Sequence, residues 1–152
     1  MLAISWIHQG DPGYPSILPS ILGKNAPLRI ATLGNLDILK HKPLALFCSV
    51  KCPGNLILQT YDLARSLRQA GVTVIGGFHS PMEQECLTIL LRGAQPLLVC
   101  PARSLEGMRV PAEYRQPLET GRLLLVSPFN GKDRRITEET ALLRNRFVGA
   151  LA

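Results

Sequence analysis

The sequence predicts a three-layer α/β fold with a mainly parallel sheet, and two observations support this prediction. First, 152 residues with 46% hydrophobic and 18% charged composition suit one compact domain with a substantial core. Second, from residue 44 onward short apolar runs alternate with amphipathic stretches, as buried parallel strands alternate with the helices that cover them. This alternation is typical of Rossmann-like folds.

Four apolar runs have the length and composition of buried strands. They are LALFC at residues 44–48, VTVI at 72–75, PLLVC at 96–100 and RLLLV at 122–126. Their order along the chain predicts four parallel strands joined by helices.

Helical patterns follow these runs. They cover residues 57–67, 82–90, 111–120 and the segment from 137 to the chain end. The second helix has the clearest signal, because SPME at residues 80–83 has the form of a capping box with proline at the first helical position. The third pattern is the weakest.

The first 42 residues differ from the rest. Seven proline and glycine residues between positions 12 and 34 break every run into pieces of at most a turn or two. We therefore predict a cap of short helices and loops at residues 1–42 and a Rossmann-like domain at residues 43–152.

Charge and cysteine content narrow the class of protein. A net charge of +6 suits an anionic partner such as nucleic acid. The four cysteines form no C-x-x-C pair, which favours reduced thiols over disulfides or a metal site, and no cofactor is expected. With neither a signal-peptide pattern nor the ~20 apolar residues of a membrane helix, the chain is expected in the cytoplasm, away from membranes.

The loops that follow the four strands form the expected functional region. Right-handed β-α units place all of them at one edge of a parallel sheet. Two lead into helix N-termini, where free backbone N–H groups favour an anion, although the same residue types also serve in ordinary turns. The candidate phosphate contacts in these loops are Ser49, Lys51, Gly76, Gly77, His79, Ser80 and Arg103.

His79 and Glu83 allow two interpretations. Four residues apart, they could form an acid–base pair that transfers protons. Glu83 also stands where a capping-box carboxylate accepts from the backbone of Ser80, and we favour this structural role. We accordingly predict no catalytic residues and expect Glu83→Gln to cost little stability.

The last helix carries Arg144, Asn145 and Arg146. Residues two apart on a helix point about 200° apart, so the two arginines cannot reach one site. The sequence does not choose between them. The adjacent Arg134 and Arg135 could also meet a phosphate, but we expect plain solvated charge there.

The chain resembles the DNA-processing protein A family along most of its length. Tyr14-Pro15 and Gly34-Asn35 are similar to early signals of that family, and its Arg-Asn-Arg motif is matched in full at residues 144–146. Its Gly-Ser-Arg loop keeps only Ser49, followed by Lys51. Residues 76–83 match its glycine-rich loop in part, with Gly77 retained and an acid at the end.

The resemblance implies a Rossmann-like domain that binds single-stranded DNA and hands it to a recombinase during uptake or recombination. It assigns DNA contacts to Ser49, Lys51, Gly77, His79 and residues 144–146. A nucleotide-binding or nucleotide-hydrolysing enzyme of the same superfamily is the alternative, with Glu83 or His79 transferring the proton. A third possibility is a structural domain whose site has decayed.

Two further expectations concern partners and aromatic contacts. Only Phe78 and Phe129 lie in candidate loops, fewer aromatics than single-strand binding proteins often use for stacking. Since no strand follows the last helix, we predict an open sheet edge that either pairs with a second copy or gains stability when the chain is extended.

Overall fold

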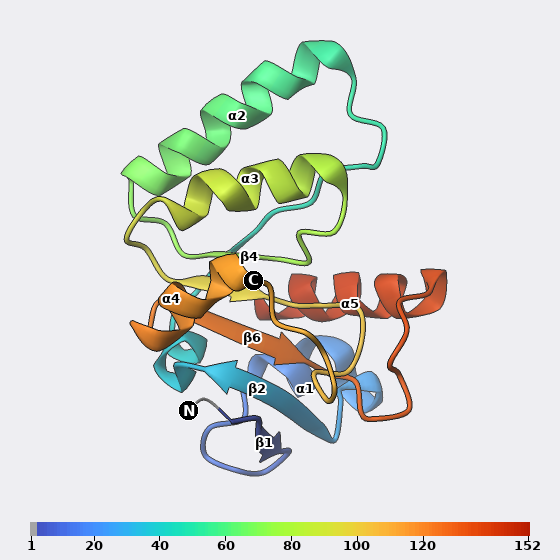
Figure 1. The fold of residues 1–152 in the computed structure, drawn as a ribbon. Coiled ribbons are helices and arrows are strands. Elements are labelled where there is room, and N and C mark those ends of the chain that lie inside the picture. Colours follow the sequence, from blue (N-terminus) through green and yellow to red (C-terminus); the bar gives the residue numbers. More distant parts are fainter. Residues whose placement is uncertain (1–2) are drawn as a thin grey trace.

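The computed structural model describes residues 3–152, which form a six-stranded sheet between two layers of helices (Figure 1). The strand order is β1-β2-β6-β5-β4-β3. The four predicted strands are all present and parallel: β3 (Leu44–Ala45), β4 (Val74–Gly76), β5 (Leu97–Val99) and β6 (Leu123–Ser127). The Rossmann-like fold predicted from the sequence is confirmed.

The N-terminal region corrects one expectation. Besides the short helices α1 (Ile17–Leu22), η1 (Gly23–Asn25) and η2 (Leu36–Lys40), it contributes two strands to the sheet. Strand β2 (Arg29–Gly34) pairs antiparallel with β6, and β1 (Ser5–His8) pairs antiparallel with β2. The prediction of only helices and loops at residues 1–42 is therefore wrong, because runs of four to six residues between breakers are long enough for strands.

The remaining helices lie where the sequence places them. Helices α2 (Gly54–Gln69), α3 (Pro81–Leu91) and α5 (Glu138–Leu151) follow β3, β4 and β6. The weak third pattern forms the short helices η3 (Ala112–Tyr114) and α4 (Arg115–Glu119). No helix within residues 3–152 combines the length and apolarity needed to span a membrane.

Strand β6 shows how one sequence pattern supports two cores. Leu123 and Leu125 pack in the core that includes side chains of α2, α3 and α4. Leu124 and Val126 point to the opposite face and pack in the core that includes α1 and α5. Since successive side chains of a strand alternate between faces, a continuous apolar run implies burial on both sides. This alternation separates the three layers visible in Figure 1.

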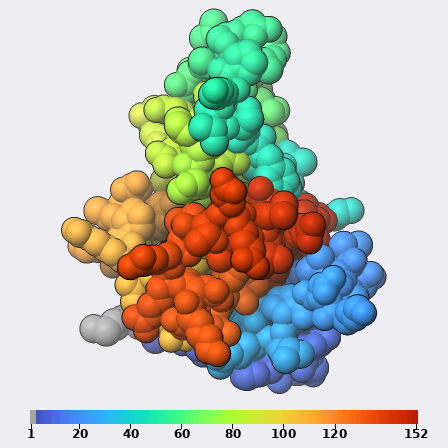
Figure 2. Space-filling model, turned by 90° about the vertical axis from the view of Figure 1, so that its right-hand side faces the viewer, coloured from blue at the N-terminus to red at the C-terminus, as the bar shows by residue number. Residues whose placement is uncertain are grey.

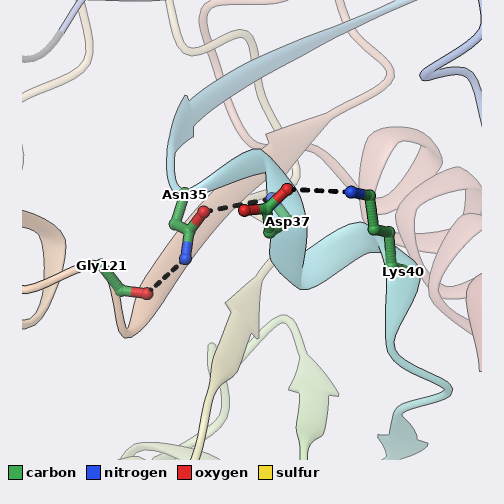
Figure 3. Close-up of polar contacts among 4 residues, drawn as sticks. All are labelled: Asn35, Asp37, Lys40 and Gly121. Carbon is green, nitrogen blue, oxygen red and sulfur yellow. Dashed lines mark hydrogen bonds and ion pairs between the residues drawn. The ribbon is translucent and has the colours of Figure 1, made fainter.

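Asn35 joins the end of β2 to the turn before β6 (Figure 3). The side-chain amide of Asn35 donates to the carbonyl of Gly121 at 2.7 Å, while its Oδ1 accepts from the backbone N–H of Asp37 at 3.1 Å. Gly34 has φ +120°, and a Cβ atom there would overlap the carbonyl oxygen of Leu123. In this chain the Gly-Asn pair therefore has a structural role.

Candidate functional site

A cavity of about 280 Å³ opens at the carboxyl edge of the parallel strands. It lies between the loop after β4, the loop after β5 and the side chain of one α5 residue. We call it the edge cavity and define it by five of its lining residues, Gly77, His79, Arg103, Arg109 and Arg144. Figure 2 views the molecule from the side on which these loops emerge. No Asp or Glu of residues 3–152 lines it.

Arg144 is the most constrained cation of the edge cavity. Its side chain is only 5% exposed, although it carries a charge. Nη1 donates to the carbonyl of Cys100 at 3.1 Å, and Nε donates to Oδ1 of Asn145 at 2.8 Å. Within the described part of the chain Arg144 forms no ion pair, and Nη2 donates no hydrogen bond.

Burial lowers the pKa of the Arg144 guanidinium, and the negative charge of nearby Glu83 partly opposes that effect. An arginine remains protonated under ordinary conditions, so the side chain is a buried cation without a direct counter-ion. Such an arrangement is costly unless a ligand supplies negative charge. Arg144 thus places a positive charge without an ion-pair partner beside the edge cavity.

Gly77 makes the position of Arg144 possible. A Cβ atom on Gly77 would overlap the Arg144 guanidinium, so only glycine lets the two segments approach this closely. The loop after β4 and the middle of α5 therefore build one surface. Gly76 is also restricted, because a Cβ there would lie 3.1 Å from the carbonyl oxygen of Leu46 and 3.3 Å from the Phe78 ring.

Phe78 adopts a backbone conformation that is rare for a bulky residue. Its φ is +49°, in the left-handed region, and its side chain is 4% exposed. The following residue, His79, is exposed, and Ser80 is buried again. Left-handed backbone in a non-glycine residue costs about 1–3 kcal/mol and clusters at functional sites. Nothing in the sequence signalled this conformation.

Glu83 serves as the capping carboxylate predicted from the sequence. Its Oε1 accepts from the backbone N–H groups of His79 and Ser80 at 3.2 and 3.0 Å. Its Oε2 accepts from the backbone N–H of Cys48 at 3.0 Å, and the Ser80 hydroxyl donates to the Cys48 carbonyl at 2.9 Å. The capping box is confirmed, and it also ties α3 to the segment after β3.

Arg103 is held by its own loop beside the cavity. Its Nε donates to the carbonyl of Ser104 at 3.0 Å, and Nη2 donates to the carbonyl of Glu106 at 3.2 Å. The hydroxyl of Ser127, at the end of β6, donates to the Arg103 carbonyl at 2.7 Å. These bonds fix the guanidinium at the rim.

Comparison with known proteins decides the family. A sequence model of DNA recombination-mediator protein A matches residues 5–152. This chain belongs to that family. The DNA recombination-mediator protein A family is a family of DNA-processing proteins. No curated protein sequence matches the chain significantly.

Two solved structures of DNA-processing protein A share the fold. The protein from Streptococcus pneumoniae has a TM-score of 0.76 at 18% sequence identity, with 98% of this chain and 52% of that chain covered. The protein from Helicobacter pylori has a TM-score of 0.73 at 18% identity, with 98% and 66% covered. The latter structure was described for its unique mode of binding single-stranded DNA. This chain thus spans about half to two thirds of these relatives.

The predicted site residues do not all gather in one place in this member of the recombination-mediator family. The edge cavity contains Gly77, His79, Arg103 and Arg144, with Gly76 and Ser80 beside it. Ser49 lines a separate cavity of about 350 Å³ next to α2, and its hydroxyl donates to the carbonyl of the exposed Lys51 at 3.1 Å.

The structure also distinguishes the two arginines of the Arg-Asn-Arg motif. Arg144 points into the edge cavity, whereas Arg146 lines a different cavity, of about 400 Å³, together with Leu22 and Asn25. Asn145 is exposed and orients Arg144 through the hydrogen bond to Nε. The helical spacing that separates the arginines is the reason for this division.

Several cavity residues were missed by sequence reasoning. Arg109, Tyr114 and Ile136 line the edge cavity. Arg109 and Ile136 belong to irregular segments without periodicity, and the weak helical pattern that covers Tyr114 does not indicate which side chains face the cavity.

None of the four cysteines forms a disulfide bond. All four are free thiols. Burial raises the pKa of both Cys86 and Cys100 to about 12. Within residues 3–152, no group of three or more His, Cys, Asp and Glu side chains could hold a metal ion.

Proposed function

We propose that this chain binds single-stranded DNA in the edge cavity, as a step of DNA uptake or recombination. The observation that carries the proposal is Arg144, a buried guanidinium without an ion pair in residues 3–152, which lines a cavity free of carboxylates. A phosphodiester supplies the negative charge that this arrangement favours. Family membership and the described DNA binding of the Helicobacter pylori protein support the same ligand.

The edge cavity is large enough to hold one part of a DNA strand but too small to enclose the strand. Its volume of about 280 Å³ is at or below the lower end of the roughly 300–1,000 Å³ usual for small-molecule sites. A polymer would therefore place one nucleotide or phosphate inside and keep the rest of the strand at the surface. Arg103, Arg109 and His79 stand at the positions where that phosphate and its neighbours would meet donors.

Phe78 and Phe129 contribute little stacking surface in this proposal. They are 4% and 6% exposed, so neither presents a free ring face to a base. Recognition would then rest on phosphate contacts rather than on base contacts, and binding would tolerate many sequences.

The alternative of a nucleotide-hydrolysing enzyme receives less support. A general base needs a carboxylate oxygen free to take a proton from water or substrate. Both oxygens of Glu83 already accept from backbone N–H groups of three residues. This arrangement favours binding over hydrolysis through Glu83.

The proposal includes the partners that the family resemblance implies. We infer that the chain acts in the cytoplasm, where it would pass bound DNA to a recombinase, and that a homodimer would present two edge cavities. Each of these needs its own test by co-purification and by sedimentation at several protein concentrations.

A binding titration tests the proposal. Wild-type protein should bind labelled oligothymidylate with micromolar or tighter affinity at low salt, and Arg144→Gln should weaken binding by about tenfold or more. Arg146→Gln is the matched control, because it removes the same charge from the same helix but outside the edge cavity. Thermal melts check that both variants fold. Equal affinity for the two variants would refute the proposal.

A further inference from the structure

A second hollow, of about 450 Å³, lies next to the edge cavity. It is formed by the loop after β6 and the start of α5. We call it the basic groove and define it by Lys132, Arg134, Arg135, Thr137 and Leu143, which line it. Figure 2 shows this orange-to-red part of the chain, after β6, occupying the centre of the face on which the loops emerge.

One short segment, residues 135–137, contributes to the lining of both hollows. Ile136 lines the edge cavity, whereas its neighbours Arg135 and Thr137 line the basic groove. Ile136 is 45% exposed, so it offers apolar surface at the place where the two linings meet. A strand that leaves the edge cavity past Ile136 would reach the residues of the basic groove.

The cations of the basic groove are available to a ligand. Lys132, Arg134 and Arg135 are exposed, and none forms an ion pair within the described residues. Of these three side chains, only that of Arg134 donates a hydrogen bond within the described residues. Its Nε donates to the carbonyl of Gly131 at 3.1 Å. The groove is also lined by the carboxylates of Asp133 and Glu139, so three cations face two anions.

The apolar residues of the basic groove suit the less polar parts of a nucleotide. Leu143 is 44% exposed and offers apolar surface to sugars or base edges. Phe129 also lines the groove but is 6% exposed, so it offers no free ring face for stacking. Cations together with apolar surface fit a chain of phosphates and sugars better than an isolated small anion.

We propose that single-stranded DNA held in the edge cavity continues over Ile136 into the basic groove, where Lys132, Arg134 and Arg135 contact its phosphates. This inference rests on the proposed function and extends it from one contact point to a path. It assigns Arg134 and Arg135 a ligand, where the sequence alone led us to expect plain solvated charge. The path predicts that affinity grows with the length of the strand, and that the added affinity depends on these three residues.

Two oligothymidylates separate the contributions of the two hollows. A strand of about 4 nucleotides reaches the edge cavity alone, and one of about 16 nucleotides can also fill the basic groove. The test variant is Lys132→Gln/Arg134→Gln/Arg135→Gln. The control variant is Lys40→Gln/Lys42→Gln/Arg92→Gln, which removes the same charge from exposed positions at the opposite edge of the sheet.

We expect wild-type protein to bind the long strand at least tenfold more tightly than the short one. In the test variant, the two strands should bind with nearly equal affinity. The slope of log affinity against log salt for the long strand should become shallower by about 2, since each phosphate contact on a single strand contributes about 0.7. The short strand should bind the test variant nearly as well as the wild type. A second variant that keeps Arg134, Lys132→Gln/Arg135→Gln, should show a smaller effect in the same direction.

The outcomes distinguish this inference from the proposed function. If the test and control variants lose the same affinity for the long strand, the path through the basic groove is overturned. Binding in the edge cavity stays supported in that case if Arg144→Gln still weakens binding of the short strand. Failure of wild-type protein to bind either strand would overturn both.

Discussion

At the scale of single residues, Gly77 and Arg144 depend on each other. The guanidinium occupies the space that a side chain at position 77 would need. The family resemblance named both residues from the sequence. Their contact could not be predicted, because it joins a loop and a helix that are distant in the chain.

Gly77→Ala should therefore impair binding by displacing Arg144. We expect single-stranded DNA to bind about tenfold more weakly, which corresponds to about 1.4 kcal/mol. Fluorescence anisotropy with labelled oligothymidylate measures the effect. Gly149→Ala is the control, because a Cβ at this position in α5 meets no atom within 4 Å. Unchanged binding by Gly77→Ala, with the fold intact, would show that the position of Arg144 does not matter.

Glu83 matters more for the fold than the sequence alone suggested. Its carboxylate accepts three backbone N–H groups, one of them from Cys48 outside the capping box. In Glu83→Gln the amide nitrogen cannot accept, so at least one buried donor loses its partner. The variant should be destabilised by about 1–3 kcal/mol in urea unfolding. Glu85→Gln, on the exposed side of α3, should stay within about 0.5 kcal/mol of wild type; a similarly small change for Glu83→Gln would contradict this account.

At the scale of elements, the sequence predicted the parallel strands and their helices because periodicity and capping residues signal them locally. Ser80 and Glu83, for example, identify the start of α3 without any tertiary information. Strands β1 and β2 carry no such signal. The prolines and glycines that surround them are typical of loops, and the two strands are held by pairing, β2 with β6 and β1 with β2.

Gly34→Ala tests the junction between β2 and β6. An alanine at this position would be strained by the positive φ of +120°, and its Cβ atom would overlap the carbonyl oxygen of Leu123. Gly10→Ala is the matched control, because Gly10 has φ +99° but meets nothing within 4 Å. We expect Gly34→Ala to be destabilised by at least about 2 kcal/mol more than Gly10→Ala in denaturant unfolding. Equal losses would show that β2 can shift away from β6 without cost.

At the scale of the whole molecule, the net charge of +6 is spread along the sequence and does not by itself locate a site. The fold concentrates Arg103, Arg109 and Arg144 at one cavity without carboxylates. The sequence predicted the edge of the sheet from the rule that strand-to-helix loops converge there. It could not predict that Ser49 borders a separate cavity, because loop conformation determines which neighbouring side chains meet.

Mapping the bound strand on the protein tests the central claim most directly. Amide signals of isotopically labelled protein would be followed by NMR during titration with a short oligothymidylate. The account predicts that the largest shifts occur at residues 76–80, 101–104 and 144–145, which surround the edge cavity. Shifts concentrated instead at residues 49–53 beside α2, or around Arg146 and the N-terminal helices, with the edge cavity unaffected, would contradict it.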